Sequence, residues 1–319
     1  MFSIILPLYN KAKYIEKAVF SIHAQTFNDF ELIVVDDGST DDGLTVLRDA
    51  IRSIESKLEK GIFDYTILEQ ANQGVSVARN NGVKIAKYQY IAFLDADDWW
   101  EATYLEEMHN LIKKYPSSSI YGCSYYKVKR GTNIRANIGV DTDFQDGLID
   151  YFKVYAKTMY MPIWTGATIV RSDVFRLENG FKPKLKGGED FELWVRIAHK
   201  FGVAFLNKPL AYYNQDVDIA TRAVGSKLYE PEEHVIFCDF GDLNHNEDFR
   251  VLFEILAVYA LLPYYLSGKF KFEVDRIIST IRWENHAFKY RLYFRILPRP
   301  MVKLWFWMKE IAYLLKGAM

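Results

Sequence analysis

The segment YIAFLDADD at residues 90–98 decides the fold class, because a short apolar run changes abruptly into three carboxylates. Two similar apolar runs precede it, SIILPL at residues 3–8 and FELIVV at residues 30–35. Nearly continuous apolar runs of this length are typical of parallel strands that are covered on both faces. The segments between the runs space their apolar residues three and four apart, as amphipathic helices do: residues 14–25, 41–54 and 74–87. This alternation predicts an α/β fold.

The alternation becomes less regular after about residue 119 and stops near residue 220. A helix is expected to begin near Glu189. Strand-like runs are expected at residues 120–128, 165–170, 203–206 and 210–213. The pattern predicts two domains: an α/β domain over residues 1–220, and a helical, aromatic-rich and basic region over residues 221–319.

The composition is that of a globular protein with no electrostatic preference for nucleic acid. The 319 residues include 40 Lys+Arg and 41 Asp+Glu, a net charge of -1, and 50% are hydrophobic. Cys123 and Cys238 are too far apart in sequence for a zinc knuckle and fit a reducing compartment. The N-terminus lacks a signal-peptide pattern, and the apolar run 251–266, interrupted by Glu254 and Pro263, is shorter than the ~20 residues of a membrane span. We therefore expect a cytoplasmic location.

Acidic residues follow the predicted strands at the points where the strands end. DDGS at residues 36–39 follows the second run, and Asp95, Asp97 and Asp98 follow the third. Open parallel sheets bind ligands outside the carboxyl ends of their strands, so these side chains should meet at one edge. Carboxylates so close together repel one another unless a cation or a donor-rich ligand compensates their charge. The sequence therefore predicts the ligand site at this edge.

Two common nucleotide-binding classes are excluded by the residues of the chain. A dinucleotide-binding dehydrogenase needs G-x-G-x-x-G after the first strand, where this chain has PLYN at residues 7–10. A P-loop needs G-x-x-x-x-G-K-[ST], and the pair Gly268-Lys269 has Pro263 where the first glycine belongs.

Four segments resemble, in order, the N-terminal motifs of family 2 glycosyltransferases of the GT-A fold. They are PLYN at residues 7–10, VVDDGS at residues 34–39, NQGVSVARN at residues 72–80 and FLDADD at residues 93–98. The resemblance covers about residues 1–215 and implies a mostly parallel central sheet flanked by helices, to which the helical C-terminal region is appended. It also implies a metal-dependent, inverting transfer of a sugar from a nucleotide sugar, with UDP favoured, to a saccharide or lipid-linked acceptor of surface polysaccharide synthesis.

The aspartates of the fourth motif are the candidate metal site. In an extended segment Asp95 and Asp97 point to the same face, and their hard oxygen atoms suit Mn²⁺ or Mg²⁺. The resemblance implies that Asp97 binds the metal directly, that Asp95 reaches the ribose or the water shell of the metal, and that Ala96 lines the donor site. A solvated turn that caps a helix near Glu101 is the alternative.

The resemblance also implies a nucleotide site on residues of the first three motifs. Tyr9 matches a position that packs against the base, and Pro7 belongs to the same site. Asp37 matches a residue that accepts a hydrogen bond from the uracil imide, and Arg79 lies on the diphosphate or ribose side. Asp36 is explained equally well as a ligand contact or as a cap of the turn into the next helix.

GGED at residues 187–190 resembles the acidic pair that precedes a helix in this family, whose second acid is the base. Asp190 is thereby implied as the group that takes the proton of the acceptor hydroxyl, with Glu189 and Trp164 on the acceptor side. From the residues alone, the helix dipole explains two acids in a first turn equally well, and it would lower their pKa. Trp164 is explained either by stacking on a sugar ring or by burial in the core.

The chain departs from the family where many members carry a histidine metal ligand. It has YNQD at residues 213–216, and there is no histidine between His199 and His234. The Gln-x-x-Arg-Trp signature of processive members is absent, which favours addition of a single sugar. Two alternatives are a nucleotidyltransferase-like enzyme, whose usual Gly-rich loop is missing, and a non-catalytic sugar-nucleotide-binding protein, which would be expected to have lost Asp97 or Asp190.

The C-terminal region is strongly basic. Residues 264–319 carry 11 Lys+Arg against 4 Asp+Glu, a net of +7 that is balanced by -8 elsewhere. Apolar residues recur there at helical spacing: Met301, Leu304, Trp305, Met308, Ile311, Ala312 and Leu315. Such a stripe either lies in an anionic membrane interface, on the inner face of the cell membrane, or packs on the catalytic domain or on the second subunit of a homodimer.

Overall fold

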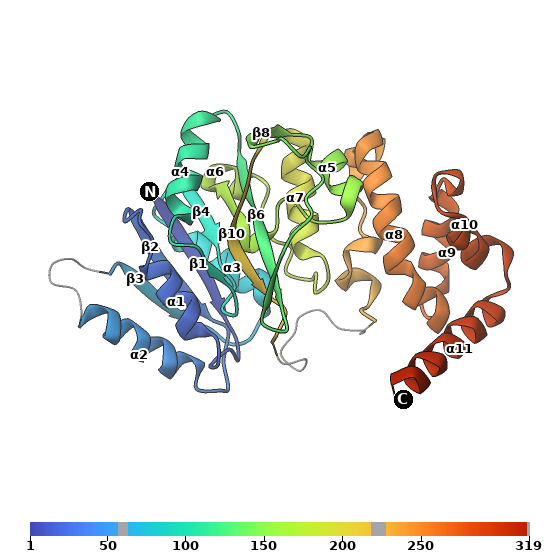
Figure 1. Cartoon of the computed structure of the whole chain (residues 1–319), viewed down its shortest axis with the longest axis horizontal. Helices are drawn as coiled ribbons and strands as arrows, with labels where there is room; N and C mark the ends of the chain where they lie inside the picture. The colour runs from blue at the N-terminus through green and yellow to red at the C-terminus, as the bar shows by residue number, and fades with distance from the viewer. Residues whose placement is uncertain (57–62, 218–227, 318–319) are drawn as a thin grey trace. The chain divides into compact units, whose positions relative to one another are not determined.

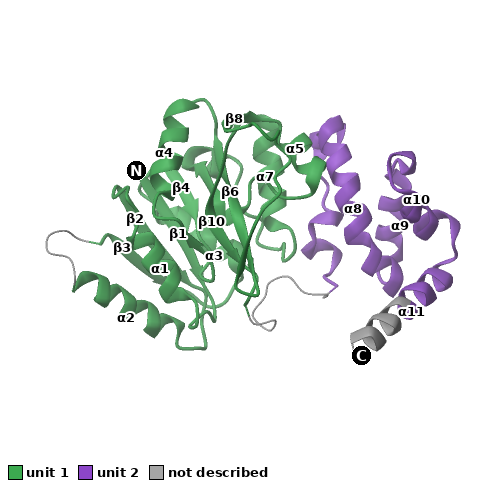
Figure 2. Cartoon of the chain, viewed as in Figure 1, with its two compact units in different colours: residues 1–225 green, residues 226–319 purple. Residues whose placement is uncertain are grey.

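The computed structural model describes residues 1–56, 63–217 and 228–317, with side chains up to residue 308 (Figure 1). The chain divides into two compact units, residues 1–225 and residues 226–319 (Figure 2). The first unit consists of a β-sheet with flanking helices, and the described part of the second is helical. The boundary predicted at residue 220 lies outside the described residues.

The N-terminal half of unit 1 confirms the predicted alternation. Four strands are parallel neighbours: β1 (Phe2–Leu8), β2 (Phe30–Asp36), β3 (Tyr65–Glu69) and β4 (Tyr90–Phe93). The helices between them lie within two residues of the predicted ends: α1 (Ile15–His23), α2 (Gly43–Glu55) and α3 (Val75–Ile85). The sequence missed β3 because its side chains are only partly buried and do not form an apolar run.

Both faces of these strands are covered, as their apolar runs predicted. Ile4 and Leu6 of β1 belong to the core that includes the buried residues of α1 and α2. Ile5 points to the opposite face, where α3 comes so close that a Cβ atom on Gly82 would lie 2.6 Å from Ile5 Cγ2. Glycine is therefore required at the point where α3 crosses β1.

The second half of the sheet is mixed. The strand order is β3-β2-β1-β4-β9-β6-β10-β5, and β9 (Thr168–Arg171) runs antiparallel to both β4 and β6. The remaining strands and helices of unit 1 are β5 (Trp99–Trp100), α4 (Tyr104–Lys114), β6 (Ile120–Lys129), β7 (Thr132–Arg135), β8 (Asp146–Ile149), α5 (Tyr151–Thr158), α6 (Ser172–Leu177), α7 (Glu189–Lys200) and β10 (Val203–Asn214).

Two strand predictions in this half need correction. Residues 165–167 form a 3₁₀ turn, and the strand begins only at Thr168. The two short strands expected at residues 203–206 and 210–213 are one strand, β10, whose register against β6 is irregular between Leu206 and Ala211. The interruption includes Pro209, which has no N–H to donate to the ladder.

The register of the parallel strands explains why the acidic segments meet. Leu8 pairs with Asp36, so Tyr9 and Asp37 leave the sheet side by side. Ile5 pairs with Phe93, and the N–H of Leu94 donates to the carbonyl of Ile5, so the segment after β4 leaves at the same edge. The backbone pairing alone therefore brings three of the motifs together.

Unit 2 is held by its own apolar core. Its longer helices are α8 (Glu247–Ser267), α9 (Lys271–Thr280) and α11 (Arg299–Gly317), with the short α10 (Phe288–Arg291) before a π-helical turn at residues 292–296. Its core residues include Val258, Leu261, Ile278 and Val302.

By length and composition α8 could cross a membrane. The helix has 21 residues and begins before the apolar run 251–266 that the sequence analysis considered. Core helices of globular proteins meet the same criterion, and α8 places Val258 and Leu261 in the core of unit 2.

Candidate functional site

One cavity of about 920 Å³ opens at the carboxyl edge of the parallel strands. Its lining comes from the ends of β1, β2, β4 and β10 and from the first turns of α3 and α7. All the residues that the sequence analysis singled out for the site line it: Pro7, Tyr9, Asp37, Arg79, Asp95, Ala96, Asp97, Trp164, Glu189 and Asp190. Asp36 is absent from this lining and instead accepts from the N–H of Ser39 in the turn after β2, 3.4 Å away.

Asp37 organises the loop that leads into α3. One of its carboxylate oxygens accepts from Gln70 Nε2 at 2.7 Å and from the N–H of Gln73 at 2.8 Å, and the other accepts from the N–H of Gly74 at 2.8 Å. A carboxylate offers about four lone-pair sites, so one acceptor position is left for a ligand. Tyr9 stands at the rim of the cavity and is 45% exposed.

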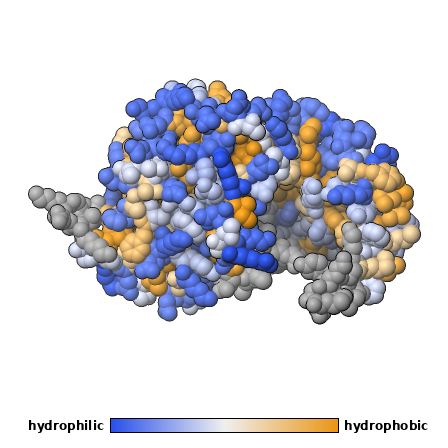
Figure 3. All heavy atoms as spheres, in the orientation of Figure 1, coloured by the Kyte–Doolittle hydropathy of each residue, from blue (hydrophilic) through white to orange (hydrophobic). Residues whose placement is uncertain are grey.

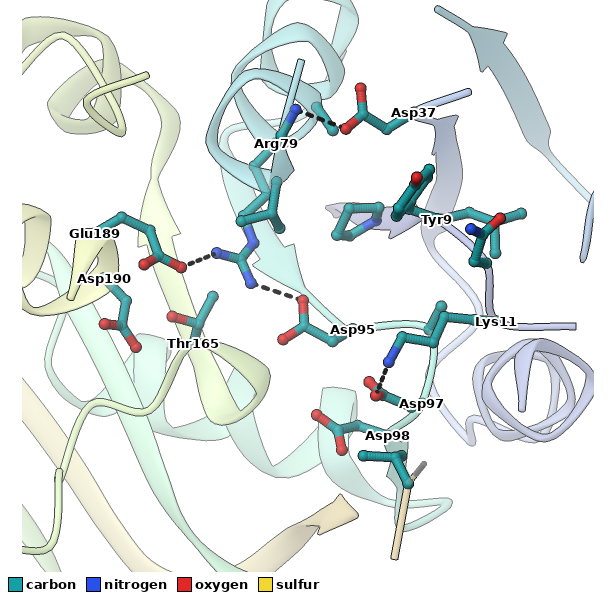
Figure 4. A pocket seen from close by; sticks show the side chains of 18 of the residues that line it. Tyr9, Lys11, Asp37, Arg79, Asp95, Asp97, Asp98, Thr165, Glu189 and Asp190 are labelled. Atoms are coloured by element: carbon teal, nitrogen blue, oxygen red, sulfur yellow. Dashed lines mark hydrogen bonds and ion pairs between the residues drawn. The ribbon is translucent and has the colours of Figure 1, made fainter. Parts of the chain in front are cut away.

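Arg79 lies buried between two carboxylates from different parts of the chain (Figure 4). One guanidinium nitrogen is 2.7 Å from Asp95, and the other is 3.5 Å from Glu189. Burial acts to lower the pKa of Arg79, but these carboxylates outweigh it and the pKa is raised. Arg79 therefore joins the end of β4 to the beginning of α7 with a fixed positive charge.

The remaining aspartates of the fourth motif have different partners. Asp97 pairs with Lys11, whose Nζ lies 2.5 Å from a carboxylate oxygen. Asp98 is buried and accepts from the N–H of Asn214 at 2.7 Å, which ties the end of β10 to this loop. Burial raises the pKa of Asp98 well above its usual range, and burial also raises the pKa of Asp97 although Lys11 opposes that effect.

The described residues contain no group of three or more His, Cys, Asp or Glu side chains that could hold a metal by themselves. The donor set that does line the cavity, the carboxylates of Asp95 and Asp97, fits a hard divalent cation. At the position of the family histidine, the cavity is lined by Asn214 and Gln215.

Glu189 and Asp190 open α7 after Gly188, which adopts the left-handed conformation with φ 77°. Asp190 accepts from the N–H of Phe191 at 2.7 Å. Burial raises the pKa of Asp190, and burial followed by the charge of Asp190 raises the pKa of Glu189 to about 7. The helix dipole alone would lower both pKa values. Because both are raised, desolvation outweighs the dipole at the beginning of α7.

Aromatic side chains form the wall on the side of α7. The ring centroid of Trp164 lies 4.9 Å from that of Tyr125 and 5.1 Å from that of Tyr213. Trp164 is 9% exposed and lines the cavity, so it is buried in the core, and its stacking on a sugar ring stays a prediction.

The sequence analysis missed Lys11 and Tyr213 as cavity residues. Lys11 directly follows the motif PLYN, so its position was a usable signal. Asp98 was expected at this edge as part of the fourth motif but was given no role of its own.

The model of the family described as "Glycosyl transferase family 2" matches residues 3–177, more than half of the chain. The chain belongs to family 2 of the glycosyltransferases. It is therefore a glycosyltransferase, and the nucleotidyltransferase and non-catalytic alternatives are not retained.

Relatives and solved structures agree with this family. The poly(ribitol-phosphate) β-N-acetylglucosaminyltransferase TarP of Staphylococcus aureus is 34% identical over 306 residues, which are 90% of this chain and 83% of TarP. An uncharacterized glycosyltransferase of Rickettsia felis is 30% identical over 213 residues, 66% of this chain but only 32% of that protein, so the chain spans about a third of its length. The crystal structure of residues 1–349 of S. aureus TarS in complex with UDP-GlcNAc matches with a TM-score of 0.60 and 19% identity, over 93% of this chain and 76% of that fragment. That likeness confirms the GT-A-like fold.

The raised pKa of Glu189 predicts a pH-dependent stability difference. In the folded chain this carboxyl keeps its proton up to about pH 7, whereas the unfolded chain releases it at lower pH. The protonated carboxyl of Glu189 therefore adds to the free energy of unfolding at low pH, and this contribution is lost as the pH rises through 7. Glu189→Gln removes the titration, so the unfolding free energy of the variant relative to wild type should increase by about 1–3 kcal/mol between pH 5 and pH 8.

Urea denaturation at both pH values measures this difference. Glu55→Gln, at an exposed position of α2, is the control and should show no such change. If the unfolding free energy of Glu189→Gln relative to wild type were the same at pH 5 and pH 8, the Glu189 carboxyl would not be desolvated.

Proposed function

We propose that unit 1 transfers one sugar from a UDP-sugar, with inversion, to a saccharide or lipid-linked acceptor of surface polysaccharide synthesis. The observation that carries this proposal is the cavity that brings the four N-terminal motifs to the acidic pair of α7. In an inverting transfer the acceptor oxygen bonds to the anomeric carbon on the face opposite the departing diphosphate. A site for it needs a donor pocket, a base and an acceptor wall, and this cavity has candidates for all three.

Two related proteins support a UDP-sugar as the donor. TarP is a β-N-acetylglucosaminyltransferase that acts on poly(ribitol-phosphate), and TarS has been solved with UDP-GlcNAc. UDP-GlcNAc is therefore the first donor to test, with poly(ribitol-phosphate) among the first acceptors. In this chain, we assign the uracil to Tyr9, Pro7 and the remaining acceptor position of Asp37.

The carboxylate of Asp97 is our candidate for holding Mn²⁺ or Mg²⁺ together with oxygens of the diphosphate. When bound, a divalent ion would neutralise the charge that develops on the leaving diphosphate. Asp95 is already held by Arg79, so we assign it to the ribose or to the water shell of the metal.

Asp190 is our candidate for the base. Glu189 lies 3.5 Å from Arg79, whereas the Asp190 carboxylate accepts from the backbone N–H of Phe191 next to it in α7. A carboxylate with a raised pKa is a stronger base than a solvated one. The aromatic wall of Trp164 and Tyr213 lies on the same cavity and would support the ring of the acceptor sugar.

Unit 2 exposes apolar and aromatic side chains on its surface (Figure 3). On α11, Met301, Leu304, Trp305 and Met308 are each about half exposed, while Val302 is buried in the unit core. The rest of the predicted stripe, residues 311–315, lies outside the described side chains. We propose that this face, in a region of net positive charge, lies on an anionic membrane surface and keeps the enzyme near a lipid-linked acceptor on the cytoplasmic side.

Asp97→Ala should abolish the gain in UDP affinity that Mn²⁺ provides, because it removes the proposed protein ligand of the metal. We expect at least about a tenfold weaker binding of UDP in the presence of Mn²⁺, equivalent to about 1.4 kcal/mol, measured by calorimetry. The exposed Asp49→Ala is the control. Equal metal-dependent affinity of wild type and Asp97→Ala would contradict the assignment.

Asp190→Asn keeps the shape of the side chain and removes the proton acceptor. Turnover should fall by about 10²–10⁴ while UDP binding stays within about twofold of wild type. Steady-state kinetics and calorimetry on the same preparation separate the two effects. Activity within about tenfold of wild type would move the role of base elsewhere, and Glu189→Gln tests the neighbouring acid.

Trp305→Ser combined with Trp307→Ser should reduce co-sedimentation with anionic vesicles by several fold, because both indoles are about half exposed and suit a membrane interface. Phosphatidylglycerol vesicles are compared with phosphatidylcholine vesicles at low salt, and Leu177→Ser, at an exposed position of unit 1, is the matched control. If wild-type protein stays in the supernatant, the face is a homodimer or packing surface instead, and sedimentation velocity of the same variants tests for a dimer.

A further inference from the structure

The ion pair between Lys11 and Asp97 occupies the position at which the metal is proposed to bind. The two residues are 86 positions apart in sequence, and their side chains are only 15% and 16% exposed. Both line the cavity. A largely buried ion pair of this kind is much less screened by solvent than a surface pair.

The backbone holds Lys11 at this place. Asn10, directly before it, adopts a left-handed conformation with φ 52°, and its side-chain oxygen accepts from the N–H of Thr40 at 2.7 Å. The carbonyl of Lys11 accepts from the N–H groups of Tyr14 and Ile15, which fixes the entrance to α1. These hydrogen bonds hold the backbone of Lys11 in the turn between β1 and α1, and its side chain reaches Asp97.

Each aspartate of the fourth motif has its own partner within the chain. Arg79 pairs with Asp95, Lys11 pairs with Asp97, and the N–H of Asn214 donates to Asp98. The charge of Lys11 acts on Asp98 as well as on Asp97. A divalent ion that approaches Asp97 must therefore compete with an ammonium group for the same carboxylate.

We propose that Lys11 is a positioning residue that neutralises Asp97 in the donor-free enzyme and is exchanged for the metal when the nucleotide diphosphate arrives. This inference rests on the proposed function. The phosphate oxygens supply the negative charge that draws the ion to Asp97, and the released ammonium group pairs with the same diphosphate. Binding of metal and nucleotide is thereby coupled, and metal alone binds weakly.

The experiment measures Mn²⁺ binding by electron paramagnetic resonance of the free ion, without nucleotide and with saturating UDP. Lys11→Met keeps the length and the apolar stem of the side chain but removes its charge. It should bind Mn²⁺ about tenfold more tightly than wild type without nucleotide, since a like charge next to the site is removed. With saturating UDP, Lys11→Met should bind Mn²⁺ no more tightly than wild type or more weakly, because the variant lacks the contact of Lys11 with the diphosphate.

Two variants show whether the charge at this position is responsible. Lys13→Met, at an exposed position two residues further along, should bind Mn²⁺ as wild type does. Lys11→Arg keeps the positive charge and should retain weak metal binding. Circular dichroism melts establish that each variant is folded. Equal Mn²⁺ affinity of folded Lys11→Met and wild type, or tight binding by Lys11→Arg, would overturn the inference.

Wild-type protein provides a further test that does not depend on any variant. If it binds Mn²⁺ as tightly without UDP as with UDP, Lys11 does not couple the two ligands and the inference fails while the proposed metal site stands. If wild type binds neither UDP nor Mn²⁺ under any of these conditions, the proposed function itself fails.

Discussion

The buried guanidinium of Arg79 is the interaction on which the arrangement of the cavity depends. Unpaired buried carboxylates are costly, and Asp95 and Glu189 share this single cation from two different elements. Asp95 follows β4 and Glu189 opens α7, so the contacts of Arg79 join the end of β4 to the beginning of α7. A neutral residue in place of Arg79 would leave two carboxylates without compensation and would affect both edges at once. Arg79 therefore connects the proposed donor side of the cavity, through Asp95, with the proposed acceptor side, through Glu189.

Much of this edge could be predicted from the sequence because parallel strands end at the same side of a sheet. Apolar runs marked β1, β2 and β4, and the polar residues after each run had to meet. The helices α1, α2 and α3 followed from their 3.6-residue period. The strand β3 could not be found in this way, since it lies at the edge of the sheet and is only partly buried. The irregular course of β10 depends on its pairing with β6, which no local pattern reports.

The contacts between side chains were less accessible to prediction than the positions of the motifs. The pairing of Lys11 with Asp97 depends on how sharply the chain turns after β1, and the contact of Asp98 with Asn214 depends on where β10 ends. The pKa of Glu189 and that of Asp190 also depend on tertiary burial. The sequence offered the helix dipole as a reason for lowered pKa values, but desolvation raises both. A dipole acts on any helix start, whereas desolvation is known only when the surrounding wall is known.

That wall is what distinguishes the two neighbouring acids of α7. Adjacent residues in a helix are separated by about 100° around its axis, so the side chains of Glu189 and Asp190 leave α7 in different directions. Glu189 reaches toward Arg79, and ionising it is favoured by that cation. Asp190 lies among buried tyrosines, since its charge is felt by Tyr125, Tyr151 and Tyr155, and these rings offer it no full charge in return. Burial raises the pKa of both acids, and the charge of Arg79 opposes that effect at each of them. The contacts, rather than the pKa values, therefore separate the two acids: Glu189 is joined to Arg79, and Asp190, our candidate for the base, is surrounded by aromatic rings.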